Sequence, residues 1–134
     1  MNIIPYLFFN GRCEEAIEFY RRAVDAEVTE LMRYKDGPDS EITPPGADEK
    51  IMHACITVGD SMVMMSDGDC DGKLNFAGVS LAIGVDDLDE GGKLFNALAD
   101  GGQVQMPFSK TFWSPGFGML LDRFGVSWMV NVNE

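Results

Sequence analysis

The sequence is poor in the side chains that build transition-metal centres. It holds a single histidine, His53, and three cysteines, Cys13, Cys55 and Cys70, which are widely spaced and form no CxxC pair. Catalytic zinc and non-haem iron sites usually take two or three imidazole or thiolate ligands. The composition argues against such a centre, a zinc cluster or a disulfide framework, whereas a carboxylate-only site for Mg²⁺ or Mn²⁺ stays open. We expect no metal and no cofactor.

Positive charge and long apolar runs are also scarce. Lys and Arg number 10 against 22 Asp and Glu, which gives a formal net charge of −12 over 134 residues. Such a chain repels phosphate backbones and anionic lipid, so we expect neither nucleic acid nor a membrane as partner. The apolar runs are far shorter than a membrane span, and no charged segment precedes one at the N-terminus. We therefore expect a cytoplasmic protein.

One order of elements occurs twice along the chain. The first half predicts, in order, a strand at 3–9, a helix at 12–24 and strands at 27–34, 51–58 and 61–66. Within it, the Pro-, Gly- and Asp-rich segment 35–50 predicts a long mobile loop. After a polar link at 67–75, the second half predicts a strand at 79–85, a helix at 88–99 and strands at 103–108, 117–121 and 126–132. We therefore predict an α+β fold of two tandem βαβββ repeats, about 1–68 and 77–134, in a single domain over residues 1–134.

The second repeat carries the clearest local signals. Asp86 and Asp87 provide an N-cap for the helix, whose inward face is predicted to hold Leu88, Leu94, Phe95 and Leu98. The last two strands flank a turn at 122–125, where Gly125 can take the positive φ that such turns often demand. The lead-in at 111–117 is too apolar for an idle loop, and we interpret it as one wall of a pocket.

Several motifs carry a resemblance to a known superfamily. They are Glu15 to Tyr20 (EAIEFY), Val85 to Leu88 (VDDL) and Asp122 to Trp128 (DRFGVSW), which is similar to a DPxGxxW turn. The chain resembles the glyoxalase / bleomycin-resistance / extradiol-dioxygenase superfamily, also called vicinal oxygen chelate. Its PhnB-like branch, often labelled by similarity to 3-demethylubiquinone methyltransferase, is indicated by Pro5 to Phe9, Ile51 to Ala54, and the aromatic stretch Phe112 to Met119.

The resemblance implies a curved mixed sheet with helices on its outer face, a homodimer and ligand clefts shared between subunits. In metal-dependent members, ligands come from the first and last strands of each half. Those places correspond here to Pro5, Val63, Ser80 and Met129. None of these side chains binds a transition metal as such a site requires, so the metal chemistry of the superfamily is not expected here.

Strand alternation predicts which side chains face a cavity. In the strand 51–58, His53, Cys55 and Thr57 point away from the apolar face that packs under the helix. Counting four residues past Gly59 and Gly125 assigns the faces of Val63 and Met129 to the cavity, and with them Met65 and Asp67. The predicted ligand-binding residues are His53, Cys55, Met65, Asp67, Trp113, Phe117 and Met129.

Each of these residues also has a structural interpretation. His53 is either a general base or a structural histidine held by hydrogen bonds, and Cys55 either a nucleophile or a small buried apolar residue. Asp67 either anchors a polar group or forms a turn. Trp113 and Phe117 either line the pocket or pack in the core or in a dimer interface. Methionine is more often core filler than ligand contact.

Two functions remain open. The first is metal-free binding of a small aromatic or cationic molecule in an apolar cavity, as the resemblance to bleomycin-resistance proteins implies. The alternative is a metal-independent enzyme that uses His53 as a base on a small aromatic or quinone-like substrate. Methyl transfer is disfavoured, because the chain has no Gly-rich turn between a strand and a helix of the type that binds methyl donors.

Overall fold

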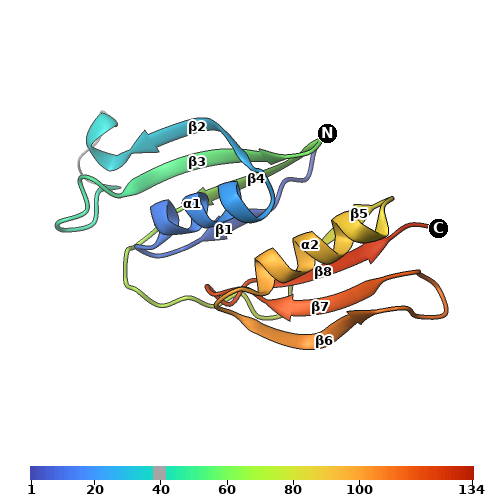
Figure 1. Ribbon diagram of the computed structural model, residues 1–134. Coiled ribbons are helices and arrows are strands. Elements are labelled where there is room, and N and C mark those ends of the chain that lie inside the picture. The colour runs from blue at the N-terminus through green and yellow to red at the C-terminus, as the bar shows by residue number, and fades with distance from the viewer. Residues whose placement is uncertain (38–41) are drawn as a thin grey trace. The chain divides into compact units, whose positions relative to one another are not determined.

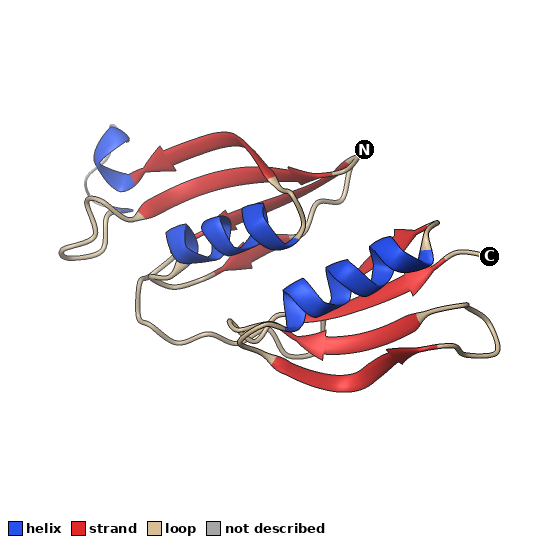
Figure 2. Ribbon diagram, in the orientation of Figure 1, coloured by secondary structure: helices blue, strands red, loops and turns tan. Residues whose placement is uncertain are grey.

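The computed structural model describes residues 1–37 and 42–134 (Figures 1 and 2). The chain divides into two compact units, Met1–Leu74 and Asn75–Glu134. Each unit contains one α-helix and one four-stranded mixed sheet. The predicted α+β fold of two tandem βαβββ repeats is therefore confirmed, with one hydrogen-bonded sheet in each repeat.

Unit 1 runs through β1 (Tyr6–Phe8), α1 (Cys13–Ala23), β2 (Glu27–Arg33), a short 3₁₀ helix η1 (Tyr34–Asp36), β3 (Ile51–Val58) and β4 (Ser61–Ser66). The strand order is β1-β4-β3-β2, in which β1 is parallel to β4 and the other neighbours are antiparallel. Backbone hydrogen bonds tie the ends of the predicted loop 35–50 together, from Lys35 N–H to the Asp48 carbonyl at 3.0 Å. The predicted mobility of this loop falls partly on 38–41, outside the described residues.

Unit 2 runs through β5 (Ser80–Val85), α2 (Leu88–Ala99), β6 (Gln103–Ser109), β7 (Phe117–Leu121) and β8 (Ser127–Val132). The strand order β5-β8-β7-β6 repeats that of unit 1, again with the first strand parallel to the last. The predicted bounds of α2 and β7 are matched residue for residue. The same chain path therefore builds both halves.

Each helix covers one face of its own sheet (Figure 2). Phe95 and Leu98 of α2 are buried as predicted, and the Asp87 carboxylate caps the helix by accepting the Glu90 N–H at 2.9 Å. The prediction that Leu88 faces inward is wrong, since 48% of it is exposed. Leu88 is the first residue of the helix, directly after the cap, and so lies at the margin of the face that α2 packs onto the sheet.

The face of each sheet that the helix leaves uncovered is called the open face below. In unit 1, register places Cys55 beside Met64 and Ala54 beside Met65. Ala54 and Met65 are fully buried, and side chains alternate along a strand. The open face of unit 1 therefore carries Tyr6, Phe8, Glu30, His53, Cys55, Met62 and Met64. That of unit 2 carries Ser80, Ala82, Phe117, Met119, Ser127, Met129 and Asn131.

Candidate functional site

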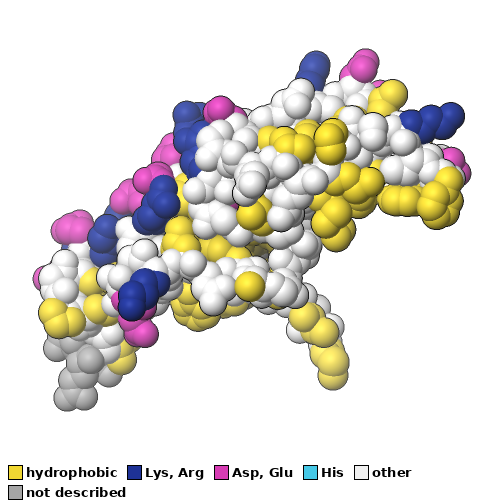
Figure 3. Space-filling model, turned by 90° about the horizontal axis from the view of Figure 1, so that it is seen from below, with side chains coloured by type: hydrophobic (Ala, Val, Ile, Leu, Met, Phe, Trp, Pro, Cys, Tyr) yellow, Lys and Arg dark blue, Asp and Glu magenta, His cyan; other side chains and the backbone are white. Residues whose placement is uncertain are grey.

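The open face of unit 1 presents aromatic rings to the surface. Tyr6 and Phe8 lie on the same side of β1 and are 39% and 51% exposed. Their rings stack with centroids 5.1 Å apart, and the imidazole of His53 lies 5.7 Å from the Tyr6 ring. Hydrophobic side chains are exposed in several groups on the side of the molecule drawn in Figure 3. Exposed apolar side chains that lie next to one another, as Tyr6 and Phe8 do, are a common feature of surfaces that contact a ligand or a partner.

A chain of hydrogen bonds crosses this face. The Tyr6 hydroxyl lies 2.9 Å from Nδ1 of His53, and Nε2 of His53 lies 3.3 Å from Oε2 of Glu30. An ionised carboxylate can only accept, so Nε2 carries the hydrogen. In neutral imidazole Nδ1 is then an acceptor, and Tyr6 donates its O–H to it. Both ring nitrogens of His53 are engaged, so a base at this position acts through Tyr6.

The environment keeps the Tyr6 phenol protonated. Burial raises its pKa above the ordinary value of 10.0, and a hydrogen bond with Ser66 lowers that pKa in part. A raised pKa means that the neutral phenol is the favoured form on this face. Tyr6 therefore takes part in the hydrogen-bond chain as a neutral hydroxyl group.

Cys55 lies on the open face as predicted, but its side chain is enclosed. The residue is 2% exposed, and its thiol lies 3.9 Å from the carbonyl oxygen of Ile56. Thr29 donates its hydroxyl hydrogen to the Cys55 carbonyl at 3.3 Å. This environment matches the interpretation of Cys55 as a small buried apolar residue.

Met65 and Asp67 do not share the face of His53, and the prediction that they do is wrong. Met65 is fully buried beside Ala54 on the side that α1 covers. Asp67 is 1% exposed, and its carboxylate accepts the backbone N–H groups of Gly11, Cys13 and Ile51 at 2.8 to 2.9 Å. This carboxylate holds the start of α1 and the start of β3 together.

The open face of unit 2 brings three other predicted residues together. Phe117 pairs with Asn131 across the strands, and Met119 pairs with Met129. The Trp113 ring lies edge-on to the Phe117 ring with centroids 5.2 Å apart, and 44% of Trp113 is exposed. Trp113 and Phe117 therefore form an aromatic cluster within unit 2, and that this cluster is one wall of a pocket stays a prediction.

The same face holds a polar group that the sequence analysis missed. The Oδ1 atom of Asn131 is buried and has no hydrogen-bond partner among the described residues. Buried acceptors are nearly always paired, so such an atom calls for an explanation. In the sequence, Asn131 is one polar residue in an alternating strand, and no pattern distinguishes it.

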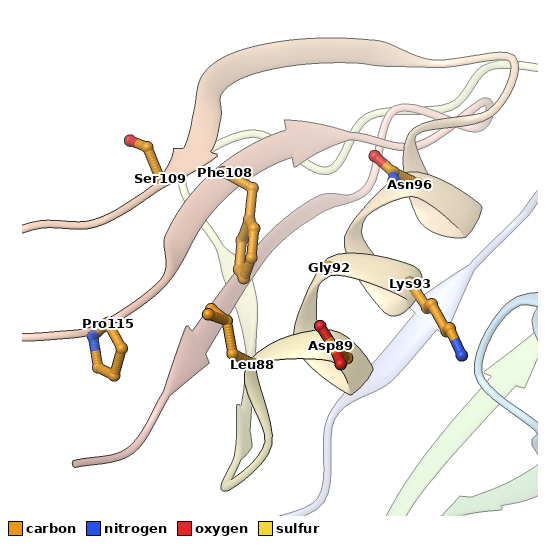
Figure 4. Close-up of a pocket in the computed structure, with 8 residues that line it drawn as sticks. All are labelled: Leu88, Asp89, Gly92, Lys93, Asn96, Phe108, Ser109 and Pro115. Atoms are coloured by element: carbon orange, nitrogen blue, oxygen red, sulfur yellow. The ribbon is translucent and has the colours of Figure 1, made fainter.

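A shallow cavity of about 570 Å³ lies on the helix side of unit 2 (Figure 4). Phe108 of β6 points toward Leu88 and Gly92 of α2, whereas the side chain of Lys93 points away from Phe108. The exposed Leu88 forms part of this lining. The lining mixes apolar side chains (Leu88, Phe108 and Pro115) with polar ones (Asp89, Lys93, Asn96 and Ser109).

The positions that correspond to the superfamily's metal ligands hold non-ligating side chains in both units. Within residues 1–37 and 42–134, no group of three His, Cys, Asp or Glu side chains lies close enough to hold a metal ion. The Ser80 hydroxyl instead shares a hydrogen bond of 2.6 Å with the Ser127 hydroxyl. That the protein works without a metal stays a prediction. Among the described residues, no helix is long and apolar enough to span a bilayer.

Sequence reasoning found His53 but missed its partners Tyr6 and Glu30. The correspondence of Pro5 to a metal-ligand position turns that side of β1 toward the cavity, together with Leu7 and Phe9, and Tyr6 alternates with these residues. Leu7 and Phe9 are buried at 8% and 0% exposure, on the side of α1. The pairing of Tyr6 with Met64 fixes its face, and this register between distant strands is not visible in the sequence.

Comparison with known proteins gives consistent relatives. The family model described as 3-demethylubiquinone-9 3-methyltransferase matches residues 1–131. The Escherichia coli K12 protein YjdN is 37% identical over 140 residues, which cover 98% of this chain and 95% of YjdN. The crystal structure of PA1353 from Pseudomonas aeruginosa is 41% identical with a TM-score of 0.87, over 99% of this chain and 98% of that one.

Two further solved structures are similar to this chain in fold. The PhnB protein of Bacillus cereus is 29% identical with a TM-score of 0.81, over 98% of this chain and 99% of that one. A glyoxalase-related enzyme from Fulvimarina pelagi covers 99% of this chain with a TM-score of 0.64, and its 16% identity shows a shared fold alone. The chain therefore belongs to the family described as 3-demethylubiquinone-9 3-methyltransferase, the PhnB-like branch of the vicinal-oxygen-chelate superfamily.

Proposed function

We propose that this protein binds a small aromatic molecule on the open face of unit 1, without a metal. The observation that carries the proposal is the set of Tyr6, Phe8 and His53, whose rings lie within 6 Å of their neighbours beside the hydrogen-bond chain to Glu30. Half-exposed rings supply apolar contact, and the chain supplies polar groups that orient a ligand. Small-molecule sites commonly combine these two features.

Charge favours a cationic member of this ligand class. Glu30 lies at the margin of the face, and its side chain is 66% exposed. Glu27 lies beside Thr57 on the same face, and the whole chain has a formal net charge of −12. An ammonium group is attracted both by the carboxylates and by the faces of aromatic rings. A protonated aromatic amine is therefore the preferred ligand class, whereas an aromatic carboxylate is disfavoured.

Equilibrium titration against matched probes tests this proposal. We expect phenethylamine to bind and to raise the melting temperature of the protein, and phenylacetate to bind at least several-fold more weakly. Phe8→Ala removes part of the ring platform and is expected to weaken phenethylamine binding about tenfold. Phe112→Ala serves as a matched control, since Phe112 is 96% exposed and lies in unit 2. Equal binding by wild type and Phe8→Ala would contradict the assignment to this face.

The hydrogen-bond chain also supports a second candidate, a metal-independent enzyme. In this candidate, the Tyr6 oxygen accepts a proton from the substrate while the Tyr6 hydroxyl proton moves to Nδ1 of a neutral His53. Tyr6 thereby ends as a neutral phenol, and His53 acts as the base. The family description names a demethylubiquinone as substrate, which is a quinone-type ring and fits an aromatic face. Methyl transfer itself gains no support, because the described residues of the two units form mixed sheets, without the Gly-rich turn and parallel sheet of Rossmann-type donor domains.

Once a substrate is found, His53→Gln separates binding from turnover. Loss of kcat at least 100-fold with little change in the dissociation constant supports the enzymatic candidate. Unchanged kcat in His53→Gln removes it and leaves the binding function in place.

A further inference from the structure

We infer that Tyr6 selects ligands that donate a hydrogen bond: its oxygen accepts from the ligand because its own proton is committed to His53. This inference rests on the proposed function, and it names the ligand group that the open face of unit 1 recognises. The ligand class is an aromatic molecule with a hydroxyl or protonated amine near the ring, in contrast to acceptor-only rings such as quinones or aryl ethers.

Glu30 is the residue that sets the direction of the chain. Its carboxylate lies 3.3 Å from Nε2 and has no hydrogen to give, so Nε2 must donate to it. A neutral imidazole carries one N–H, and Nδ1 is consequently an acceptor. The tautomer of His53 is therefore decided by a residue on β2, across the face from Tyr6. Glu30 and His53 act as positioning residues for the phenol.

Tyr6 is the end of the chain and the group that meets the ligand. Its single O–H is directed to Nδ1 over 2.9 Å. The phenol oxygen keeps lone pairs that can accept a hydrogen bond, on a residue that is 39% exposed. The Phe8 and Tyr6 ring centroids lie 5.1 Å apart, so a ligand ring that packs on Phe8 lies next to the Tyr6 phenol. A hydroxyl or ammonium group on the ligand ring can donate a hydrogen bond to the Tyr6 oxygen there. A carbonyl or ether oxygen on the ligand would instead face the lone pairs of the Tyr6 oxygen.

The tautomer can be read directly, because His53 is the only histidine. In ¹⁵N-histidine-labelled protein near pH 8, we expect one ring nitrogen to give a pyrrole-type signal assigned to Nε2 and the other a pyridine-type signal assigned to Nδ1. Glu30→Gln offers an amide N–H to Nε2 and is expected to shift the population toward the other tautomer. Glu27→Gln, a matched change on the same face, is expected to leave the signals unchanged. A wild-type protein with the hydrogen on Nδ1 would overturn the inference.

Selectivity is tested with 4-methylphenol and 4-methylanisole, which share the ring and differ in the O–H donor. We expect 4-methylphenol to bind about fivefold more tightly, which is the affinity ratio that one neutral hydrogen bond provides. This order is expected although 4-methylanisole is the more apolar probe. Tyr6→Phe and Glu30→Gln are expected to bring this ratio close to one, and Glu27→Gln to preserve it. Equal affinities in the wild type overturn the inference and leave the proposed function intact. Failure of both probes and of phenethylamine to bind overturns the proposed function, and the inference with it.

Discussion

The two units share one topology and divide the chemistry of the chain between them. The histidine, all three cysteines and all three tyrosines lie in unit 1, whereas both tryptophans lie in unit 2. The open face of unit 1 carries a hydrogen-bond chain that ends on an aromatic ring. The equivalent face of unit 2 carries methionines, an aromatic cluster and one unpaired amide oxygen. A repeated fold thus fixes where faces lie, and the side chains decide what each face does.

The hairpins of the two units show how a small difference changes a face. In unit 1 Val58 pairs with Ser61, so residues 59–60 alone form the turn. In unit 2 Leu121 pairs with Ser127, and the longer turn 122–126 contains the buried Asp122. Each unit nevertheless has a buried carboxylate that organises nearby backbone, Asp67 in unit 1 and Asp122 in unit 2. Several substitutions can break or sharpen this comparison.

The largest effect is expected from the buried carboxylates. Asp67→Ala leaves three backbone N–H groups, two of them buried, without their acceptor, and we expect the free energy of unfolding to fall by about 3 kcal/mol or more. Asp122→Ala removes the acceptor of the Phe124 and Val126 N–H groups and of the Trp128 indole N–H, with a similar expected loss. Urea unfolding followed by far-UV circular dichroism measures both.

A matched control comes from the exposed turn of unit 1. Asp60→Ala is expected to change the free energy of unfolding by less than about 0.5 kcal/mol. In a Trp113→Phe background, Trp128 is the only tryptophan, so its fluorescence reports the unfolding of unit 2. A loss below about 1 kcal/mol for Asp67→Ala would show that its three N–H groups find other partners, and the two carboxylates would then not be equivalent.

The second expected effect concerns how closely each helix approaches its sheet. A methyl group at Gly118 of β7 would lie 2.6 Å from Cε2 of Phe95 and 2.9 Å from the Phe108 Cα. Gly118→Ala is therefore expected to destabilise unit 2 by about 1 to 3 kcal/mol through overpacking. Gly84→Ala is the control, because its methyl would meet only the Asn133 amide, at 3.6 Å. Equal thermal stability of the two variants would mean that α2 can shift outward at little cost.

Most of the fold could be predicted from the sequence because its signals are local. The apolar alternation of 51–58 and 61–66, the Asp87 cap and the two repeats all depend on residues near each other in the chain, and all are confirmed. The faces were harder to predict. Counting from Gly59 and Gly125 put Val63 and Met129 on equivalent faces, but the turns differ in length.

A register change of one residue turns a side chain to the other face of the sheet. Val63 therefore lies beside Ile56 on the helix side, whereas Met129 lies beside Met119 on the open side. The prediction of the site was limited in the same way, because the contact between Tyr6 and His53 joins two strands through residues that are 47 positions apart in the sequence. Alternation alone carries no information on how such distant strands pair.

The third expected effect is alkaline sensitivity confined to unit 1. Burial raises the pKa of the Cys13 thiol far above its ordinary value of 9.0, and burial also raises the pKa of Tyr34. A raised pKa in the folded state stabilises the fold below the ordinary pKa, and this stability is lost as pH rises toward the folded-state value. Between pH 8 and 10, Cys13 alone is expected to cost about 1.4 kcal/mol.

Unfolding in urea at pH 8, 9 and 10 measures this slope. Cys13→Ala is expected to flatten it, whatever its effect on stability at pH 8, because the slope counts protons rather than contacts. Val63→Ala is the control, since it removes buried side-chain atoms from the same unit without removing a titratable group. An unchanged slope in Cys13→Ala would show that the alkaline sensitivity arises elsewhere in the chain.

The smallest expected effect is a change in the free energy of unfolding caused by replacing an asparagine with valine, and its sign differs between the two units. Asn131 in unit 2 has a buried Oδ1 without a partner among the described residues, so Asn131→Val is expected to raise the free energy of unfolding by about 0.5 to 1 kcal/mol. Asn10 in unit 1 donates to the Lys73 carbonyl and has a φ of 49°, so Asn10→Val is expected to lower it. Thermal unfolding of the pair gives opposite shifts. A destabilised Asn131→Val would mean that this amide oxygen is paired in solution, and the open face of unit 2 would then hold a polar contact comparable to the chain on unit 1.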